Sequence, residues 1–236
     1  MFENLLAGIK KDITQRVMNL SVETTGKSIL LERHRRALAS TVDYVERHMR
    51  HVDSVVSKDE LQTKAFKCAD VSGGRLICEF GVWRGESINH IARMTTSQVV
   101  GFDSFEGLPE RWWDGFKQGA FALTRLPEVE KNVTLVKGWF NETLPVYLAQ
   151  NKGPVGFLHV DSDLYSSAKT VFELLEPRLK PGAVIVFDEY FNYPEWQEGE
   201  YKAFAEFLER TNLAFDFIGY NRNGEQVAVI LREKKS

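Results

Sequence analysis

The stretch RLICEFGVWRGESINHIARMTTSQVVGFDS, residues 75–104, decides the fold. It reads as a strand with Glu79 near its end, a turn punctuated by Gly81 and Gly85, a helix, and a second strand that ends at Asp103. In an open α/β sheet, this order indicates a nucleoside-bearing cofactor outside the carboxyl ends of the strands. The glycines let the backbone approach a ligand closely, and the Asp103 carboxylate can accept hydrogen bonds from ribose hydroxyls.

The glycine spacing separates two kinds of cofactor. The motif is E-x-G-x-x-x-G, whereas folds that bind the pyrophosphate of a dinucleotide carry G-x-G-x-x-G. A ligand without phosphates is therefore favoured, and S-adenosylmethionine fits this description. A strand-to-helix turn that binds nothing could also carry two glycines, but carboxylates at two adjacent strand ends are costly as mere packing. Glu79 could alternatively orient the loop.

The composition is that of an ordinary globular chain of 236 residues, with 43% hydrophobic and 27% charged residues. A net charge of −3 gives no electrostatic reason to expect nucleic acid or an anionic membrane, and the short basic run 32–36 reads as a solvated helix face. Cys68 and Cys78 offer neither a disulfide framework nor metal-ligand spacing. Without a continuous apolar N-terminal run, we expect a cytoplasmic enzyme with no secretory signal or membrane span.

Residues 1–70 are expected to form an N-terminal helical extension, and residues 71–236 the cofactor-binding domain. Apolar residues in the extension recur every three or four positions, as on one face of a helix. A first stripe comprises Phe2, Leu5, Leu6, Ile9, Ile13, Val17 and Leu20, and a second comprises Leu38, Val42, Val45, Met49 and Val52. The S-x-x-E spacing from Ser57 to Glu60 predicts the start of a third helix. These helices could cover the sheet, pair with another subunit in a homo-oligomer, or close over the active site.

Beyond residue 71, apolar runs alternate with helical patterns, which favours an α/β fold with a mostly parallel sheet. Strands are expected near 76–80, 98–102, 133–137, 155–161, 183–188, 213–219 and 226–232. Helices are expected near 86–94, 141–150, 166–178 and 197–210. The turn residues Asn221–Gly224 predict a hairpin-like connection, so the last strand should run antiparallel. The expected fold is therefore Rossmann-like, with seven strands and helices on both faces.

Acids follow two further strands. Asp161 ends the fourth strand, and Asp188 ends the fifth, 27 residues later. Neighbouring strands lie about 5 Å apart, so the two carboxylates can converge above the sheet. Gathered carboxylates repel each other unless they are protonated or neutralised, and an all-oxygen cluster suits Mg²⁺. The alternative is a set of helix caps and loop acids. His159 lies deeper in its strand, so we favour a hydrogen-bonded structural histidine over a base.

Aromatic residues gather in the loops after the second and fifth strands, and both loops contain Gly or Pro. They comprise Phe105, Trp112, Trp113, Phe116 and Phe121 in one loop, and Tyr190, Phe191, Tyr193 and Trp196 in the other. Such loops suit a wall or lid over a substrate, although several of these side chains should belong to the core. Gly138, Trp139 and Phe140 follow the third strand, where they could stack on adenine or simply pack.

Four motifs together resemble the macrocin O-methyltransferase (TylF/MycF-like) family of class I S-adenosylmethionine-dependent methyltransferases. They are FGVWRGES (80–87), GFDSFEGLPE (101–110), HVDSDLYSS (159–167) and VIVFDEY (184–190), and the similarity covers about residues 70–232. The paired motifs at the fourth and fifth strands are the more specific, because all class I methyltransferases share the glycine loop. The resemblance implies methylation of a hydroxyl on a sugar or another natural product.

The resemblance also implies roles for individual residues. The family's cofactor-binding glutamate and glycine loop fall on Glu79, Gly81 and Gly85, and its ribose-binding acid falls on Asp103. We also expect Trp83, Ser87, Ser104 and Asp161 to contact the cofactor. The family's metal-binding acids fall on Asp161, Asp188 and Glu189, and its proposed base falls on Asp163. The family carries Asp where this chain has Glu189, which is one methylene longer.

The leading hypothesis is a Mg²⁺-assisted O-methyltransferase that acts on a small-molecule hydroxyl. The cofactor's methyl group is already activated, so the protein mainly aligns the acceptor oxygen. Asp161 and Asp188 would hold the metal, and Asp163 would take the proton. The alternatives are a metal-independent methyltransferase acting on another nucleophile and a non-catalytic Rossmann-like binding protein. A nicotinamide-dependent oxidoreductase is disfavoured by the missing G-x-G-x-x-G and by the lack of a second catalytic domain.

Overall fold

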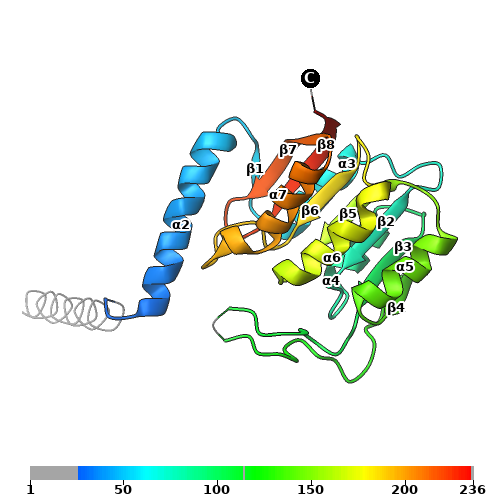
Figure 1. The fold of residues 1–236 in the computed structure, drawn as a ribbon, viewed down its shortest axis with the longest axis horizontal. Coiled ribbons are helices and arrows are strands. Elements are labelled where there is room, and N and C mark those ends of the chain that lie inside the picture. Colours follow the sequence, from blue (N-terminus) through cyan, green and yellow to red (C-terminus); the bar gives the residue numbers. More distant parts are fainter. Residues whose placement is uncertain (1–25, 114, 235–236) are drawn as a thin grey trace, which may run out of the picture.

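A computed structural model describes residues 26–113 and 115–234. Its centre is an eight-stranded sheet in the order β1-β7-β8-β6-β5-β2-β3-β4 (Figure 1). The strands are β1 (Ser54–Val55), β2 (Leu76–Phe80), β3 (Val99–Asp103), β4 (Val133–Lys137), β5 (Val155–Val160), β6 (Val184–Phe187), β7 (Leu213–Asn221) and β8 (Val227–Glu233). The seven expected strands are all present, which confirms the α/β fold. The additional strand, β1, is two residues long and too short to give a periodic sequence signal.

The strand ends are aligned in a way that builds the site. β2, β3, β4, β5 and β6 run parallel to one another, whereas β8 runs antiparallel to both β6 and β7, as expected. Phe80 of β2 pairs with Val160 of β5, and Val160 pairs with Phe187 of β6. The residues that follow these three positions therefore emerge at the same edge of the sheet. This register confirms that Asp161 and Asp188 converge.

Helices cover both faces of the sheet (Figure 1). α5 (Phe140–Gln150), α6 (Tyr165–Leu175) and α7 (Glu200–Arg210) contribute to one apolar cluster, whereas α3 (Lys58–Cys68) and α4 (Glu86–Arg93) contribute to the other. β5 and β6 lie between these layers and are buried along their whole length, which explains their continuous apolar sequences. Short 3-10 turns, Glu176–Arg178 and Trp196–Glu198, replace the ends of two expected helices.

The predicted helix start at Ser57 is confirmed. The Ser57 hydroxyl accepts a hydrogen bond from the Glu60 amide at 3.2 Å, and α3 begins at Lys58. α3 packs against β6, β7 and β8, and Leu61 and Ala65 are fully buried there. This helix of the N-terminal seventy residues thus belongs to one of the layers that cover the sheet. Its first residue lies at the carboxyl edge of the strands.

α2 (Ile29–His48) lies beyond the β1 edge of the sheet (Figure 1). The second predicted stripe is divided: Met49 is buried, whereas Leu38 and Val42 are about half exposed. The first stripe lies outside the described residues. Pairing with another subunit through these helices stays a prediction. Within the described part of the chain, no helix combines the length and the apolar character needed to cross a membrane.

Candidate active site

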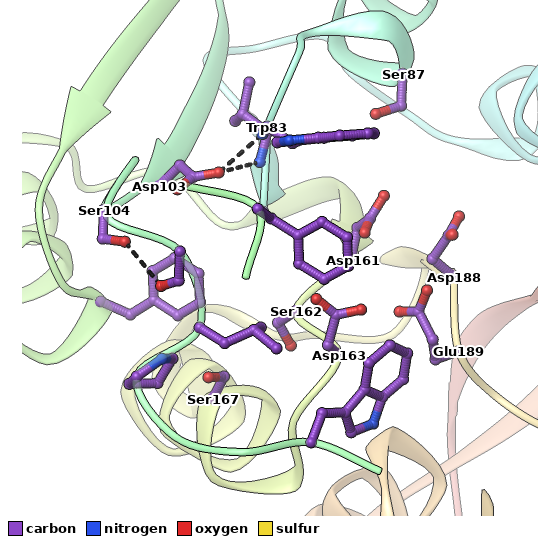
Figure 2. Close-up of a pocket in the computed structure, with 18 of the residues that line it drawn as sticks. Trp83, Ser87, Asp103, Ser104, Asp161, Ser162, Asp163, Ser167, Asp188 and Glu189 are labelled. Atoms are coloured by element: carbon purple, nitrogen blue, oxygen red, sulfur yellow. Dashed lines mark hydrogen bonds between the residues drawn. The ribbon is translucent and has the colours of Figure 1, made fainter. Parts of the chain in front are cut away.

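A cavity of about 550 Å³ opens at the carboxyl ends of β2, β3, β5 and β6. Figure 2 shows Asp161, Asp188, Asp163 and Glu189 toward one side of it, away from Asp103. The predicted site residues that line the cavity are Gly81, Trp83, Ser87, Asp103, Ser104, Trp139, Phe140, Asp161, Asp163, Asp188 and Glu189. Glu79, Gly85 and Gly138 are not among its lining residues. The structure therefore brings most of the predicted site together around one space.

Asp103 organises the loop that follows β2. Its Oδ2 accepts hydrogen bonds from the backbone amides of Val82 and Trp83, each at 2.8 Å, and its Oδ1 accepts from the Phe105 amide at 2.6 Å. A carboxylate that accepts three backbone hydrogen bonds fixes the positions of both chain segments. Gly81 has a φ of +90°, and a Cβ there would overlap the carbonyl oxygen of Asp161. Only glycine fits at this point of close approach.

Glu79 lies in β2, behind the residues that line the cavity. Its side chain is fully buried, with Oε1 accepting a hydrogen bond from the Ser87 hydroxyl at 2.9 Å and Oε2 lying 3.0 Å from His159 Nδ1. Both carboxylate oxygens are therefore engaged by protein groups. Of the two roles considered for Glu79, these contacts favour orientation of the loop. Gly85 also acts through the backbone, because it is the left-handed residue that precedes α4.

His159 is a buried, hydrogen-bonded histidine, as expected. Its Nδ1 faces Glu79, and its Nε2 lies 3.3 Å from Gln62 Nε2 and 3.5 Å from Asp188 Oδ1. Burial opposes protonation of the ring, but the interactions with Asp188 and Glu79 outweigh it and raise the pKa of His159 to about 10. The ring of His159 thus lies between the carboxylate of Glu79, in β2, and that of Asp188, which follows β6.

Lys58 joins the two converging acids. Its Nζ lies 2.9 Å from Asp161 Oδ2 and 2.7 Å from Asp188 Oδ1. Burial works against the ammonium, but both carboxylates outweigh it and hold the pKa of Lys58 above its usual range. Burial and the neighbouring Asp188 charge raise the pKa of Asp161 to about 6. Burial also opposes ionisation of Asp188, but the charges of Lys58 and His159 hold its pKa well below the usual range.

Three other acids, Glu200, Asp163 and Glu189, lie at the same edge of the sheet. Glu200, at the start of α7, accepts hydrogen bonds from the Ser162 amide at 3.0 Å and from the Glu189 amide at 3.3 Å, which ties the loops after β5 and β6 together. Burial raises the pKa of Glu200 to about 8, and burial together with neighbouring acids raises the pKa of Asp163 and of Glu189. Asp163 lines the cavity in a left-handed conformation, with φ of +60°. Such strain in a polar residue is typical of functional positions.

Three side chains are arranged so that they could hold a metal ion. His159, Asp161 and Asp188 each offer one ligand atom, and these atoms all lie within 4.8 Å of one another. Glu79 holds the opposite nitrogen of His159, as carboxylates commonly do for metal-binding histidines. These residues therefore fit a divalent cation. The residues that the structure brings together include His159 in place of Glu189, the third acid of the predicted metal site. The buried Oε2 of Glu189 has no hydrogen-bond partner among the described residues.

Some aromatic side chains of the two loops line the cavity, and the others are buried in the core. Trp112 and Phe121 line the cavity together with Trp83, whose ring is 5.6 Å from that of Phe121. Phe105 is buried in the core, as are the four aromatics of the second loop, Tyr190, Phe191, Tyr193 and Trp196. Trp139 and Phe140 line the cavity, although Phe140 also packs edge-on against Phe80.

α2 contacts both aromatic loops. His34 packs against Trp113 with ring centroids 5.3 Å apart, and the Trp196 indole N–H donates to the Ser40 hydroxyl at 3.0 Å. The Tyr44 and Tyr190 hydroxyls are 3.0 Å apart. α2 therefore braces the loops that follow β3 and β6. Among the described residues, none of α2 lines the cavity itself.

Sequence reasoning missed Lys58 and Glu200 as parts of this site. In the sequence, Lys58 is simply a residue between Ser57 and Glu60 of the predicted helix cap, because nothing there shows that α3 begins beside the strand ends. Glu200 follows Gly199 in an acidic stretch that resembles any exposed helix start. Its full burial depends on the packing of α7 against the loops after β5 and β6.

Comparisons with known proteins agree with this geometry. Residues 78–190 match a family model described as a methyltransferase domain. The chain is 33% identical, over 148 residues, to a rhamnosyl-tetracenomycin C 4′-O-methyltransferase of Streptomyces olivaceus, covering 52% of this chain and 55% of that relative. It is 26% identical to demethyldecarbamoylnovobiocin O-methyltransferase of Streptomyces niveus, covering 66% of this chain and 67% of the relative. The chain thus spans little more than half the length of the first of these relatives.

A solved structure shares the same architecture. The calicheamicin methyltransferase CalS11 superposes with a TM-score of 0.57 and 26% identity, covering 73% of this chain and 76% of the other. The match to a methyltransferase domain supports S-adenosylmethionine as the cofactor. Residues 78–190 are therefore similar to a methyltransferase domain, and the chain resembles enzymes that methylate natural products.

Proposed function

We propose that this protein transfers a methyl group from S-adenosylmethionine to a hydroxyl of a sugar-bearing natural product. The observation that carries the proposal is that the glycine loop, Asp103 and the acids at the β5 and β6 ends line one cavity. A volume of about 550 Å³ is within the usual range for a small-molecule site. The names of the relatives support the acceptor class, since one acts on a rhamnosyl group and another on a novobiocin precursor.

The loop after β2 and the end of β3 form the cofactor end of the proposed site. Backbone at Gly81 can approach the ligand closely, and Asp103 retains lone pairs for ribose hydroxyls besides its three amide contacts. Trp139 and Phe140 offer aromatic surface for adenine. Bound S-adenosylmethionine supplies a methyl group that is already activated as part of a sulfonium. The protein then has to align the acceptor and remove one proton.

Asp163 is the proposed base. It lines the cavity on the loop after β5, and its raised pKa brings the carboxylate closer to the basicity of a group that accepts protons near neutral pH. A base must be deprotonated before it acts, so methyl transfer should increase as the pH rises through the pKa of Asp163. Trp112, Phe121 and Trp83 supply an apolar wall that limits the access of water to the acceptor.

Mg²⁺ is the proposed metal, with Asp161, Asp188 and His159 as the residues that would hold it. Glu189 adds a carboxylate oxygen without a hydrogen-bond partner near the same strand end. Imidazole is a more usual ligand of Mn²⁺ and other transition metals than of Mg²⁺, so both ions belong in the test. A bound divalent cation supplies positive charge that favours loss of the acceptor's proton.

The test is methyl transfer by the purified chain from radiolabelled S-adenosylmethionine to a panel of rhamnosylated natural products, with product mapping by mass spectrometry. We expect one methyl group on a sugar oxygen, and loss of transfer in Asp163→Asn. The control is the enzyme without acceptor, which should release no labelled product. S-adenosylmethionine binding without transfer to any hydroxyl would refute the proposed reaction, and absence of binding would refute the proposed cofactor site.

A further inference from the structure

Lys58 occupies the position where a cation is needed. It is the first residue of α3, and its backbone is fixed there by the Ser57 cap and by the burial of Leu61 against the sheet. Its ammonium lies 2.9 Å from Asp161 and 2.7 Å from Asp188, on the cavity side of both carboxylates. Without a positive charge between them, these carboxylates would face each other and repel.

A metal ion and the Lys58 ammonium would use the same two carboxylates. The ammonium contacts Asp161 Oδ2 and Asp188 Oδ1, and both residues belong to the group that could hold a metal. Mg²⁺ binds carboxylate oxygens at about 2.0–2.1 Å, so an ammonium that kept its present contacts would lie in close, unfavourable contact with the ion. The two cations therefore exclude each other.

The side chain of Lys58 can leave without unfolding. About a third of it is exposed, at 32%, whereas the Asp188 side chain is only 11% exposed. Its four-carbon stem is flexible, and the ammonium is stable in water. The carboxylates are less free to move, because Glu200 anchors the backbone beside both of them, at Ser162 and Glu189. An incoming ion would thus find the two carboxylates in place and a displaceable charge between them.

We propose that Lys58 is the resident cation of the Asp161–Asp188 pair, and that a divalent cation binds there only by displacing the Lys58 ammonium. The inference rests on the metal site of the proposed function, but not on methyl transfer. In this proposal Lys58 is a positioning residue, because its ammonium holds the two carboxylates in place when no metal is bound. The cofactor end of the cavity should therefore remain intact in a chelator.

The test compares Lys58→Met with wild type by calorimetric titration of MgCl₂ and of MnCl₂, after treatment with EDTA and its removal. Methionine keeps the apolar stem and removes the charge. We expect the variant to bind at least one of these ions about tenfold or more tightly than wild type. Its melting temperature should fall in EDTA and recover with metal, whereas that of wild type should change little. Lys64→Met is the matched control, since Lys64 lies on the same helix and pairs with the exposed Asp53.

A second measurement uses only wild type, in case the variant does not fold. Acetylation of Lys58 by an N-hydroxysuccinimide ester, followed by mass spectrometry, should become several-fold faster when saturating metal is added, while Lys64 is unaffected. Equal metal affinity in wild type and Lys58→Met, no metal binding by either, or metal-independent acetylation of Lys58 would each overturn the proposal. Failure of methyl transfer would leave these readouts unchanged, so the two hypotheses fail separately.

Discussion

Replacing Asp103 with Asn should loosen two segments of the site at once. In wild type, Oδ2 accepts hydrogen bonds from two amides and Oδ1 from a third. An Asn side chain has one acceptor oxygen, so its NH₂ group must face at least one backbone N–H. Hydrogen bonds to a charged group contribute about 1.5–3 kcal/mol each, so the loss of one or two should destabilise the fold by roughly 3 kcal/mol.

This change is large enough to measure in two ways. For a chain of this size, roughly 3 kcal/mol corresponds to a decrease in melting temperature of about 6–12 °C. The affinity for S-adenosylhomocysteine, measured by calorimetry, should fall by more than about tenfold, because the ribose acceptor and the loop geometry are lost together.

The matched control is Asp216→Asn, which removes an exposed partner of Arg232 and should change stability by less than about 1 kcal/mol. Unchanged melting and unchanged cofactor affinity in Asp103→Asn would refute the role assigned to this carboxylate.

Three other predictions concern the acid end of the site. Asp161→Asn should lower the turnover number by about a hundredfold or more while the affinity for S-adenosylhomocysteine stays within about threefold, and unaltered turnover would remove this acid from the mechanism. Any residual transfer by Asp163→Asn should not increase with pH as that of wild type does, and a persisting pH profile would assign the base to another group. His159→Gln should destabilise the protein by roughly 3 kcal/mol at pH 6, measured by urea unfolding. Because its pKa is raised from 6.5 to about 10, the stability that His159 contributes is complete below pH 6.5 and is lost toward pH 10. The difference in stability between variant and wild type should therefore shrink from pH 6.5 to pH 10. A constant difference would contradict the ion pair with Glu79.

The sequence predicted the sheet well because its strands carry strong local signals. β5 and β6 are largely apolar runs followed by acids, and the turn at Asn221–Gly224 marks the antiparallel pair. The glycine loop could also be predicted from the sequence, since Gly81 is required by a contact that leaves no room for a side chain. Each of these features depends on residues that are adjacent in the chain.

The parts that were missed depend on long-range packing. Whether Glu79 contacts a ligand or orients the loop is decided by His159, eighty residues later, and by Ser87. The positions of Lys58 and Glu200 depend on where α3 and α7 begin relative to the strand ends. β1 pairs through only two residues, Ser54 and Val55, whose strand state is set by the neighbouring β7. Local patterns contain no information on such placement.

The most direct test of the account is a crystal structure of the protein with S-adenosylhomocysteine. We predict that the nucleoside lies along the loop at residues 81–87 with its ribose hydroxyls on Asp103, and that the sulfur faces the side of the cavity where Asp161 and Asp163 lie. A nucleoside bound elsewhere, or one whose sulfur points away from these acids, would contradict the proposed site.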